Sequence, residues 1–198
     1  PPDEIFGWTV PVEKAPDKPE QITLEFLKGI PIKMNGETMG GRDLITKLNI
    51  VAGKHGIGRS DIIEDRILGL KARENYEHPA ATVILTAHAD LEQLTLTRQE
   101  LAFKRIVDDK WSELAYMGLV HEPLFHDLNA FITESQQKVN GKVDLQLYKG
   151  CCRVLGRSSP KGIYSDDLVS FDSTTIDQSH ATGVSAYYGI QARLVEER

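Results

Sequence analysis

Two residues of one short polar run, Glu64 and Tyr76, could bind a ligand through their side chains. Glu64 follows Ile62 and Ile63, and an acid among apolar residues is costly to bury unless it is paired. An ionised carboxylate only accepts hydrogen bonds, so Glu64 could grip an ammonium or a ureido N–H group. Arg66 would share the face of Glu64 on a strand, so a structural ion pair explains the same pattern. The hydroxyl of Tyr76 could likewise serve a ligand or belong to an ordinary packed ring.

The segment Gly53–Arg59, GKHGIGR, could be a phosphate-binding loop. Its glycines expose backbone N–H groups, and Lys54 and Arg59 add positive charge. A Walker loop needs a Gly-Lys pair before Ser or Thr, however, and here Ser60 follows Arg59. A dinucleotide-binding fingerprint should follow a strand, whereas this run follows a predicted helix. The alternative is a helix end that leads into a tight turn.

Other chemistries have weaker sequence support. The six histidines show no zinc-ligand spacing with an acid or cysteine placed to help, and no G-x-S-x-G nucleophile motif occurs. Cys151 and Cys152 are neighbours without C-x-x-C spacing, so we expect them to pack as small side chains, with a metal or redox role as the alternative. We therefore predict no metal site and no catalytic residue in this chain.

The composition indicates a soluble globular protein that does not bind nucleic acid. A chain of 198 residues, 40% hydrophobic and 26% charged, suits one sizeable domain or one domain plus an extension. The net charge of -6 disfavours a nucleic-acid-binding surface, which would be basic. No apolar run approaches the roughly 20 residues that span a bilayer, and no secretory leader opens the chain. We expect a cytoplasmic protein, because a reducing compartment suits the cysteines.

The order of predicted strands and helices indicates an α+β fold: a mainly antiparallel sheet packed with helices, plus a C-terminal helical arm. The proline-rich residues 1–20 predict an extended linker, and such a start hints that Pro1 is a cut point in a longer chain. The strand predictions are a hairpin over residues 22–36 that closes at Asn35-Gly36, a strand over Arg66–Ala72, a hairpin around Gly150 and a short strand LVSF at residues 168–171. For residues 61–75, a strand pair or irregular structure is the alternative. Five helices are predicted. The first follows Gly41 and stops at Gly53, the second runs from Pro79 to about Leu94, and the third follows the T-x-x-E capping box of Thr97 and Glu100. The fourth runs from about Pro123 and stops before Gly141, and the fifth runs from about Ser179 to Glu197.

Several blocks of the chain, in order, resemble the argininosuccinate synthase family: AGKHGIGRSDIIEDR, LKARENYEHPA, GKVDLQLYKG and VLGRSSPKGIYSDDLVSF. The resemblance runs from about Ala15 to the last residues, so it covers most of the chain. Glu64 matches the glutamate of the family's V-E-N-R segment, and Tyr76 matches the tyrosine twelve residues later. The resemblance implies that both residues bind citrulline. It also assigns residues 21–177 to a synthetase domain and residues 178–198 to a C-terminal oligomerisation helix.

The resemblance implies a ligase of arginine biosynthesis that joins citrulline to aspartate with ATP, releasing AMP and pyrophosphate. The family binds ATP, as its Mg complex, through an S-G-G-x-D-[TS]-S loop in an N-terminal domain, and this sequence contains no such run. We therefore expect the chain to bind no cofactor and to be inactive alone. The family is homotetrameric, and the final segment would expose Tyr187, Ile190 and Leu194 unless a partner subunit covers them. The alternative is a non-catalytic oligomerisation or citrulline-binding module.

The sequence departs from the family pattern near the candidate site. Asp65 replaces an asparagine and adds a negative charge beside Glu64, Ala72 replaces a serine, and Glu74 replaces a glycine. Glu64 and Tyr76 themselves are retained, so the resemblance still implies the site, while these three positions affect its fine geometry.

Overall fold

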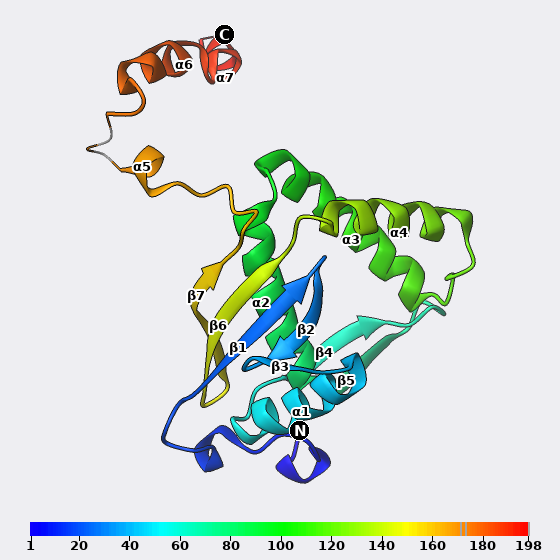
Figure 1. Ribbon diagram of the computed structural model, residues 1–198. Helices are drawn as coiled ribbons and strands as arrows, with labels where there is room; N and C mark the ends of the chain where they lie inside the picture. Colours follow the sequence, from blue (N-terminus) through cyan, green and yellow to red (C-terminus); the bar gives the residue numbers. More distant parts are fainter. Residues whose placement is uncertain (171, 173, 198) are drawn as a thin grey trace. The chain divides into compact units, whose positions relative to one another are not determined.

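Alternating apolar and polar residues from two distant parts of the chain form the central sheet (Figure 1). The computed structural model describes residues 1–170, 172 and 174–197, which divide into two compact units, Pro1–Ile163 and Tyr164–Arg198. The sheet lies in the first unit and has the strand order β3-β2-β1-β6-β7, with every neighbouring pair antiparallel. Its strands are β1 (Glu20–Leu27), β2 (Ile30–Met34), β3 (Glu37–Thr38), β6 (Gly141–Tyr148) and β7 (Cys151–Ser158).

The core lies on one face of this sheet because strand side chains alternate between faces. Leu24 of β1 is opposite Val143 of β6, and Ile22 is opposite Leu145. All four side chains are at most 2% exposed. The predicted hairpin over residues 22–36 is confirmed by the pairing of β1 with β2. Asn35 and Gly36, with φ values of 53° and 81°, form the predicted turn at the end of its second strand, which leads into β3.

Two helices complete the core against the sheet. Helix α1 (Gly41–Lys54) buries Leu44 and Leu48, and α2 (Pro79–Thr95) buries Val83 and Leu91. These residues belong to the same apolar cluster as the buried side chains of β1 and β6. Helices α3 (Arg98–Tyr116) and α4 (Pro123–Gln136) follow α2. The helices predicted after Gly41, from Pro79, after Thr97 and from Pro123 are therefore confirmed, as is the α+β fold.

The predicted capping box also forms. Thr97 Oγ1 accepts a hydrogen bond from the Glu100 amide, and the Glu100 carboxylate accepts one from the Thr97 amide. Hydrogen bonds from the Lys138 side chain and then from the Thr97 amide hold the pKa of the Glu100 carboxyl down to about 2. This local motif fixes the start of α3 independently of the core.

The prediction of a strand over Arg66–Ala72 is wrong. Strands β4 (Arg59–Asp65) and β5 (Lys71–Glu77) form a separate two-stranded sheet, and residues 66–70 are the turn between them. Gly69 adopts a φ of 77°, and its amide donates to the Arg66 carbonyl at 2.8 Å. The apolar residues that suggested a strand therefore lie exposed at the hairpin tip.

In the C-terminal unit, the predicted strand is wrong, while the predicted helical arm is confirmed but is not one continuous helix. Residues Asp166–Val169 form the short helix α5 rather than the strand LVSF, because the Val169 amide bonds locally to the Ser165 carbonyl; Phe171 lies outside the described residues. The predicted single helix over residues 179–197 is divided into η3 (Gln178–His180), α6 (Ala181–Tyr187) and α7 (Ile190–Glu196). Gly189, with a left-handed φ of 79°, lies at the break.

Residues 1–20 contain the 3-10 turns η1 (Asp3–Ile5) and η2 (Val12–Lys14) and belong to the first unit. The domain boundaries given above, 1–20, 21–177 and 178–198, stay predictions. Among the helices of the described part of the chain, none is both long enough and apolar enough to cross a membrane.

Candidate ligand-binding site

The β4–β5 hairpin carries Glu64 and Tyr76 on the same face. In its antiparallel register, Ser60 is opposite Tyr76 and Glu64 is opposite Ala72. Alternate residues of a strand share a face, so Ser60 and Glu64 lie beside Ala72 and Tyr76. We call this the ligand face, and it also includes Ile62 and Glu74.

The structure brings the two predicted site residues into direct contact. The Tyr76 hydroxyl donates a hydrogen bond to Glu64 Oε2 at 2.8 Å. The Glu64 side chain is 14% exposed, whereas Tyr76 is 41% exposed. The pair is therefore reachable from solvent, with the carboxylate partly shielded by its neighbours.

A second tyrosine, which the sequence analysis missed, also contacts Glu64. Tyr116 at the end of α3 donates to Glu64 Oε1 at 3.3 Å and lies 3.2 Å from the Asp65 carbonyl oxygen. Tyr116 is 52 residues from Glu64 in the sequence, so no local spacing connects the two. Each carboxylate oxygen of Glu64 thus accepts from one phenol, and carboxylate lone pairs remain for further donors.

The predicted ion pair between Arg66 and Glu64 is present, but Arg66 also pairs with Glu74. Arg66 Nε lies 3.6 Å from Glu64 Oε1, and Arg66 Nη2 contacts the Glu74 carboxylate. The charge of Glu74, and then that of Glu64, raises the pKa of Arg66. The hydrogen bond to Glu64 raises the pKa of Tyr76, so this phenol stays a neutral hydroxyl at physiological pH.

The three departures from the family pattern occupy different places. Asp65 belongs to the opposite face of the hairpin, where its carboxylate pairs with Lys71 at 2.7 Å. Its negative charge is therefore compensated away from Glu64. Glu74 pairs with Arg66 on the ligand face, and Ala72 is the direct neighbour of Glu64 across the two strands.

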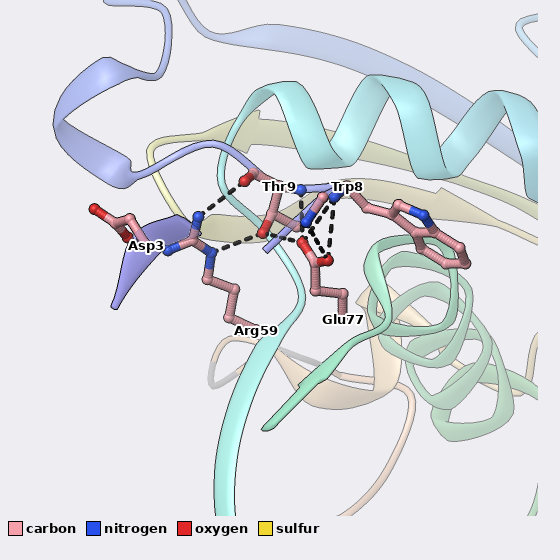
Figure 2. Close-up of polar contacts among 6 residues, drawn as sticks. Asp3, Trp8, Thr9, Arg59 and Glu77 are labelled. Atoms are coloured by element: carbon pink, nitrogen blue, oxygen red, sulfur yellow. Dashed lines mark hydrogen bonds and ion pairs between the residues drawn. The ribbon is translucent and has the colours of Figure 1, made fainter. Parts of the chain in front are cut away.

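The opposite face and the base of the hairpin carry polar contacts that the sequence analysis also missed. Arg73 pairs with Asp61 at 2.5 Å across the two strands. At the base, Glu77 and Arg59 bind the N-terminal segment through Thr9 (Figure 2). Glu77 stands in the quoted LKARENYEHPA block, but its partners are 68 to 70 residues away in the sequence.

The segment Gly53–Arg59 ends α1, in agreement with the helix-end interpretation. The amides of His55 and Ile57 donate to the Ala52 carbonyl at 3.0 and 3.1 Å. Gly58, with a φ of 94°, lies so close to Pro79 that a Cβ would be 2.6 Å from its backbone. Gly58 therefore allows the close approach of α2, and the His55 and Ile57 amides are already used within the turn.

In the part of the chain that the structure describes, the cysteines and histidines form no cluster of metal ligands. Cys152 packs against the core, where burial raises the pKa of its thiol to about 11, and Cys151 is exposed. Within the described ranges, no group of three or more His, Cys, Asp or Glu side chains could hold a metal ion.

Comparison with known proteins shows similarity along the whole chain. Residues 1–195 match the family described as "Arginosuccinate synthase C-terminal domain". The chain is 61% identical over 194 residues to the argininosuccinate synthase of Methanosarcina acetivorans, covering 98% of this chain and 49% of that protein. It is 54% identical over 200 residues to the argininosuccinate synthase of Methanocaldococcus jannaschii, covering 100% of this chain and 50% of that protein. The chain thus spans about half the length of the curated relatives it matches.

Proposed function

Because the chain belongs to the argininosuccinate synthase C-terminal domain family, we propose that it is the C-terminal part of an ATP-dependent ligase joining citrulline to aspartate. The observation that carries this proposal is the family match over residues 1–195, within which Glu64 and Tyr76 form one hydrogen-bonded pair. In this proposal the product is argininosuccinate, an intermediate of arginine biosynthesis.

The role of the ligand face is to bind citrulline. Citrulline carries N–H donors at both ends, an ammonium and a ureido group, and an ionised carboxylate accepts from either. Glu64 is the acceptor, and Tyr76 supplies a neutral hydroxyl beside it. The ligand would donate to the lone pairs of Glu64 that the two tyrosine hydroxyls leave open, so Tyr116 is a further contact near the site.

In the proposed reaction, the ureido oxygen of citrulline attacks the α-phosphate of ATP. A new oxygen–phosphorus bond forms as pyrophosphate leaves, and the product is citrullyl-adenylate. The amine of aspartate then displaces AMP from the ureido carbon. Holding three reactants in line is the main catalytic task, and this chain contributes by holding citrulline. ATP, as its Mg complex, and aspartate would be bound by an N-terminal part that carries the S-G-G-x-D-[TS]-S loop.

The C-terminal unit is the proposed oligomer contact. Helices α6 and α7 leave Tyr187 75%, Ile190 43% and Leu194 53% exposed. Exposed apolar groups of this kind on short helices are typical of a surface that a partner covers. We assign them to contacts with other subunits of a cytoplasmic homotetramer.

A second candidate is a citrulline-binding or oligomerisation module without catalysis. It is favoured by the exposed Tyr187, Ile190 and Leu194 and by the Glu64–Tyr76 pair, since neither subunit contacts nor citrulline binding at these residues requires catalysis. Both functions use Glu64 and Tyr76, so binding alone does not separate them. The presence of a nucleotide-binding domain in the same polypeptide would separate the two functions.

The test is an assay of the 198-residue chain beside a full-length polypeptide that adds the relatives' N-terminal half. With citrulline, aspartate and Mg-ATP, we expect the full-length protein to form argininosuccinate and AMP in equal amounts. We expect the 198-residue chain to form neither. A full-length protein that binds citrulline without making AMP would favour the citrulline-binding module, and one that does neither would contradict both the ligase and the citrulline-binding module.

A further inference from the structure

The base of the β4–β5 hairpin is fastened to residues Asp3–Val10, which we call the latch (Figure 2). Three successive amides surround the carboxylate of Glu77. Gly7 N lies 2.8 Å from Oε2, while Trp8 N and Thr9 N lie 3.0 and 2.7 Å from Oε1. The Thr9 hydroxyl donates to the same Oε1 at 2.6 Å. Both carboxylate oxygens are therefore held by the latch, mainly by its backbone, in the manner of an anion-binding nest.

The latch also holds Arg59, which is directly opposite Glu77 in the hairpin register. Arg59 Nε donates to Thr9 Oγ1 at 2.7 Å, and Nη2 donates to the Thr9 carbonyl at 2.8 Å. A third guanidinium nitrogen donates to Asp3 at 2.8 Å, and the guanidinium carbon lies 4.0 Å from the centroid of the Phe6 ring. Thr9 is 5% exposed, and its hydroxyl accepts from Arg59 while it donates to Glu77. One side chain thus links both strands at the open end of the hairpin.

The other side of the latch is fixed to the end of α1. The Val10 amide donates to the Gly53 carbonyl at 3.0 Å. The Trp8 carbonyl approaches Gly53 so closely that a Cβ there would lie 2.1 Å from its oxygen. The latch therefore connects the hairpin base to a helix that belongs to the core.

The charge state of Glu77 favours this arrangement at neutral pH. Burial, the largest single influence, raises the pKa of Glu77, but the hydrogen bonds from Thr9, Gly7 and Trp8 together outweigh it. The pKa of this carboxyl consequently lies below its ordinary value of 4.5. Glu77 is ionised at neutral pH, and charge-assisted hydrogen bonds are stronger than neutral ones.

The latch matters for the ligand face because packing does not fix the hairpin. Among the residues that the structure describes in β4 and β5, none is buried. Tyr76 directly precedes Glu77, and successive strand side chains point to opposite faces. Holding Glu77 on one face therefore sets the direction of Tyr76 on the other, and with it the hydrogen bond to Glu64.

We infer that Glu77 and Thr9 are positioning residues for citrulline: through the latch they hold the hairpin base so that Tyr76 and Glu64 present their hydrogen-bonding groups together. The inference rests on the proposed function, because it assigns these residues to the same site. Neither residue has to touch the substrate. Their effect is carried by the backbone of β5.

The test compares variants of the full-length ligase. Glu77→Gln keeps the side-chain shape but removes the negative charge, and Thr9→Val removes only the bridging hydroxyl. Thr9→Ser restores that hydroxyl. Glu4→Gln is the matched control. It removes the same negative charge from an exposed residue of the latch that does not bind Glu77.

Two readouts separate positioning from general stability. Amide hydrogen exchange reports on residues 7–9 and on β5, and steady-state kinetics gives KM for citrulline and for ATP. We expect Glu77→Gln and Thr9→Val to speed exchange at both places and to raise KM for citrulline by roughly three- to thirtyfold. KM for ATP should stay unchanged, and Thr9→Ser and Glu4→Gln should resemble the parent protein. If Glu77→Gln does not fold, Thr9→Val carries the test.

Other outcomes would overturn either the positioning role of the latch or the proposed function. Faster exchange in the latch with an unchanged KM for citrulline, or unchanged exchange in both variants, overturns the positioning role. Equal rises in KM for citrulline and ATP do so too, because they indicate a general structural defect. If the parent protein does not bind citrulline, the proposed function fails, and exchange at β5 alone decides whether the latch positions Tyr76.

Discussion

The five-stranded sheet and the β4–β5 hairpin are both antiparallel, but they are stabilised in different ways. The sheet packs Leu24, Leu145 and Leu48, each 0% exposed, into one apolar cluster with α1 and α2. The hairpin, over its described residues, buries none, and its strands are joined by ion pairs such as Asp61–Arg73 and Asp65–Lys71. Hydrophobic burial holds the first region, and directional polar contacts hold the second.

The candidate site residues therefore lie on the β4–β5 hairpin, the region that has no buried core. A buried strand cannot present a carboxylate and a phenol to a small polar ligand, whereas an exposed ribbon can. The β4–β5 hairpin then needs contacts with other parts of the chain to hold it in place. The latch at Glu77 and the Tyr116 hydroxyl at Glu64 are two such points, one at each end of the ligand face.

The largest effect should come from the core. Leu145→Ala removes a fully buried side chain, and such changes cost about 2–5 kcal/mol through lost burial and the cavity left behind. Urea unfolding measures the loss. Affinity for citrulline, corrected for the folded fraction, should stay within about twofold of the parent value, since distant sites act independently. A large change in corrected affinity would break the separation between the two regions.

The second-largest effect should come from acid, which opens the latch of the hairpin before it unfolds the core. A carboxyl with a depressed pKa contributes stability above its unfolded value of 4.5, and this contribution is lost as the pH falls through the lower, folded pKa. We therefore expect the latch to be closed at pH 7 and to open below pH 4.5. Trp8 lies in the latch, so its fluorescence in a Trp111→Phe background reports the opening.

The control for this titration is Glu77→Gln. In that variant the fluorescence step of Trp8 should disappear, because the titrating group is gone, while the core still unfolds at its own pH. A step that persists in Glu77→Gln would assign the titration to another carboxyl.

The smallest effect should come from the ion pairs on the opposite face of the hairpin. Asp61 and Arg73 side chains are 37% and 59% exposed, and solvent screens an exposed ion pair so that it contributes little to stability. Asp61→Asn should therefore change the free energy of unfolding far less than Leu145→Ala does and leave citrulline binding unchanged. A loss comparable to that of Leu145→Ala would mean that these pairs, rather than the latch, hold the hairpin.

The same comparison explains what the sequence could predict. Helices with strong local signals, such as the capping box at Thr97 and Glu100, were predicted correctly because the signal lies within a few residues. The alternating strands β1 and β6 were predicted because burial on one face imposes a period of two. The strand predicted over Arg66–Ala72 was wrong because Ile67, Leu68 and Leu70 are apolar yet lie at an exposed turn.

The candidate site was predicted only in part. Glu64 and Tyr76 were identified through the family resemblance, but their mutual hydrogen bond depends on a register that the wrong strand prediction did not contain. Tyr116 and the latch were missed because their contacts join residues more than fifty positions apart. Polar contacts between distant segments leave no periodic pattern in a sequence.

In the proposed function, Glu64 and Tyr76 on the ligand face bind citrulline. Calorimetric titration of citrulline into the full-length protein and its Glu64→Gln and Tyr76→Phe variants tests it most directly. We predict that Glu64→Gln weakens Kd by more than about tenfold, equivalent to about 1.4 kcal/mol, because the ionised acceptor is lost, and that Tyr76→Phe weakens it by less. Unchanged Kd in both variants would contradict the assignment of citrulline to this face.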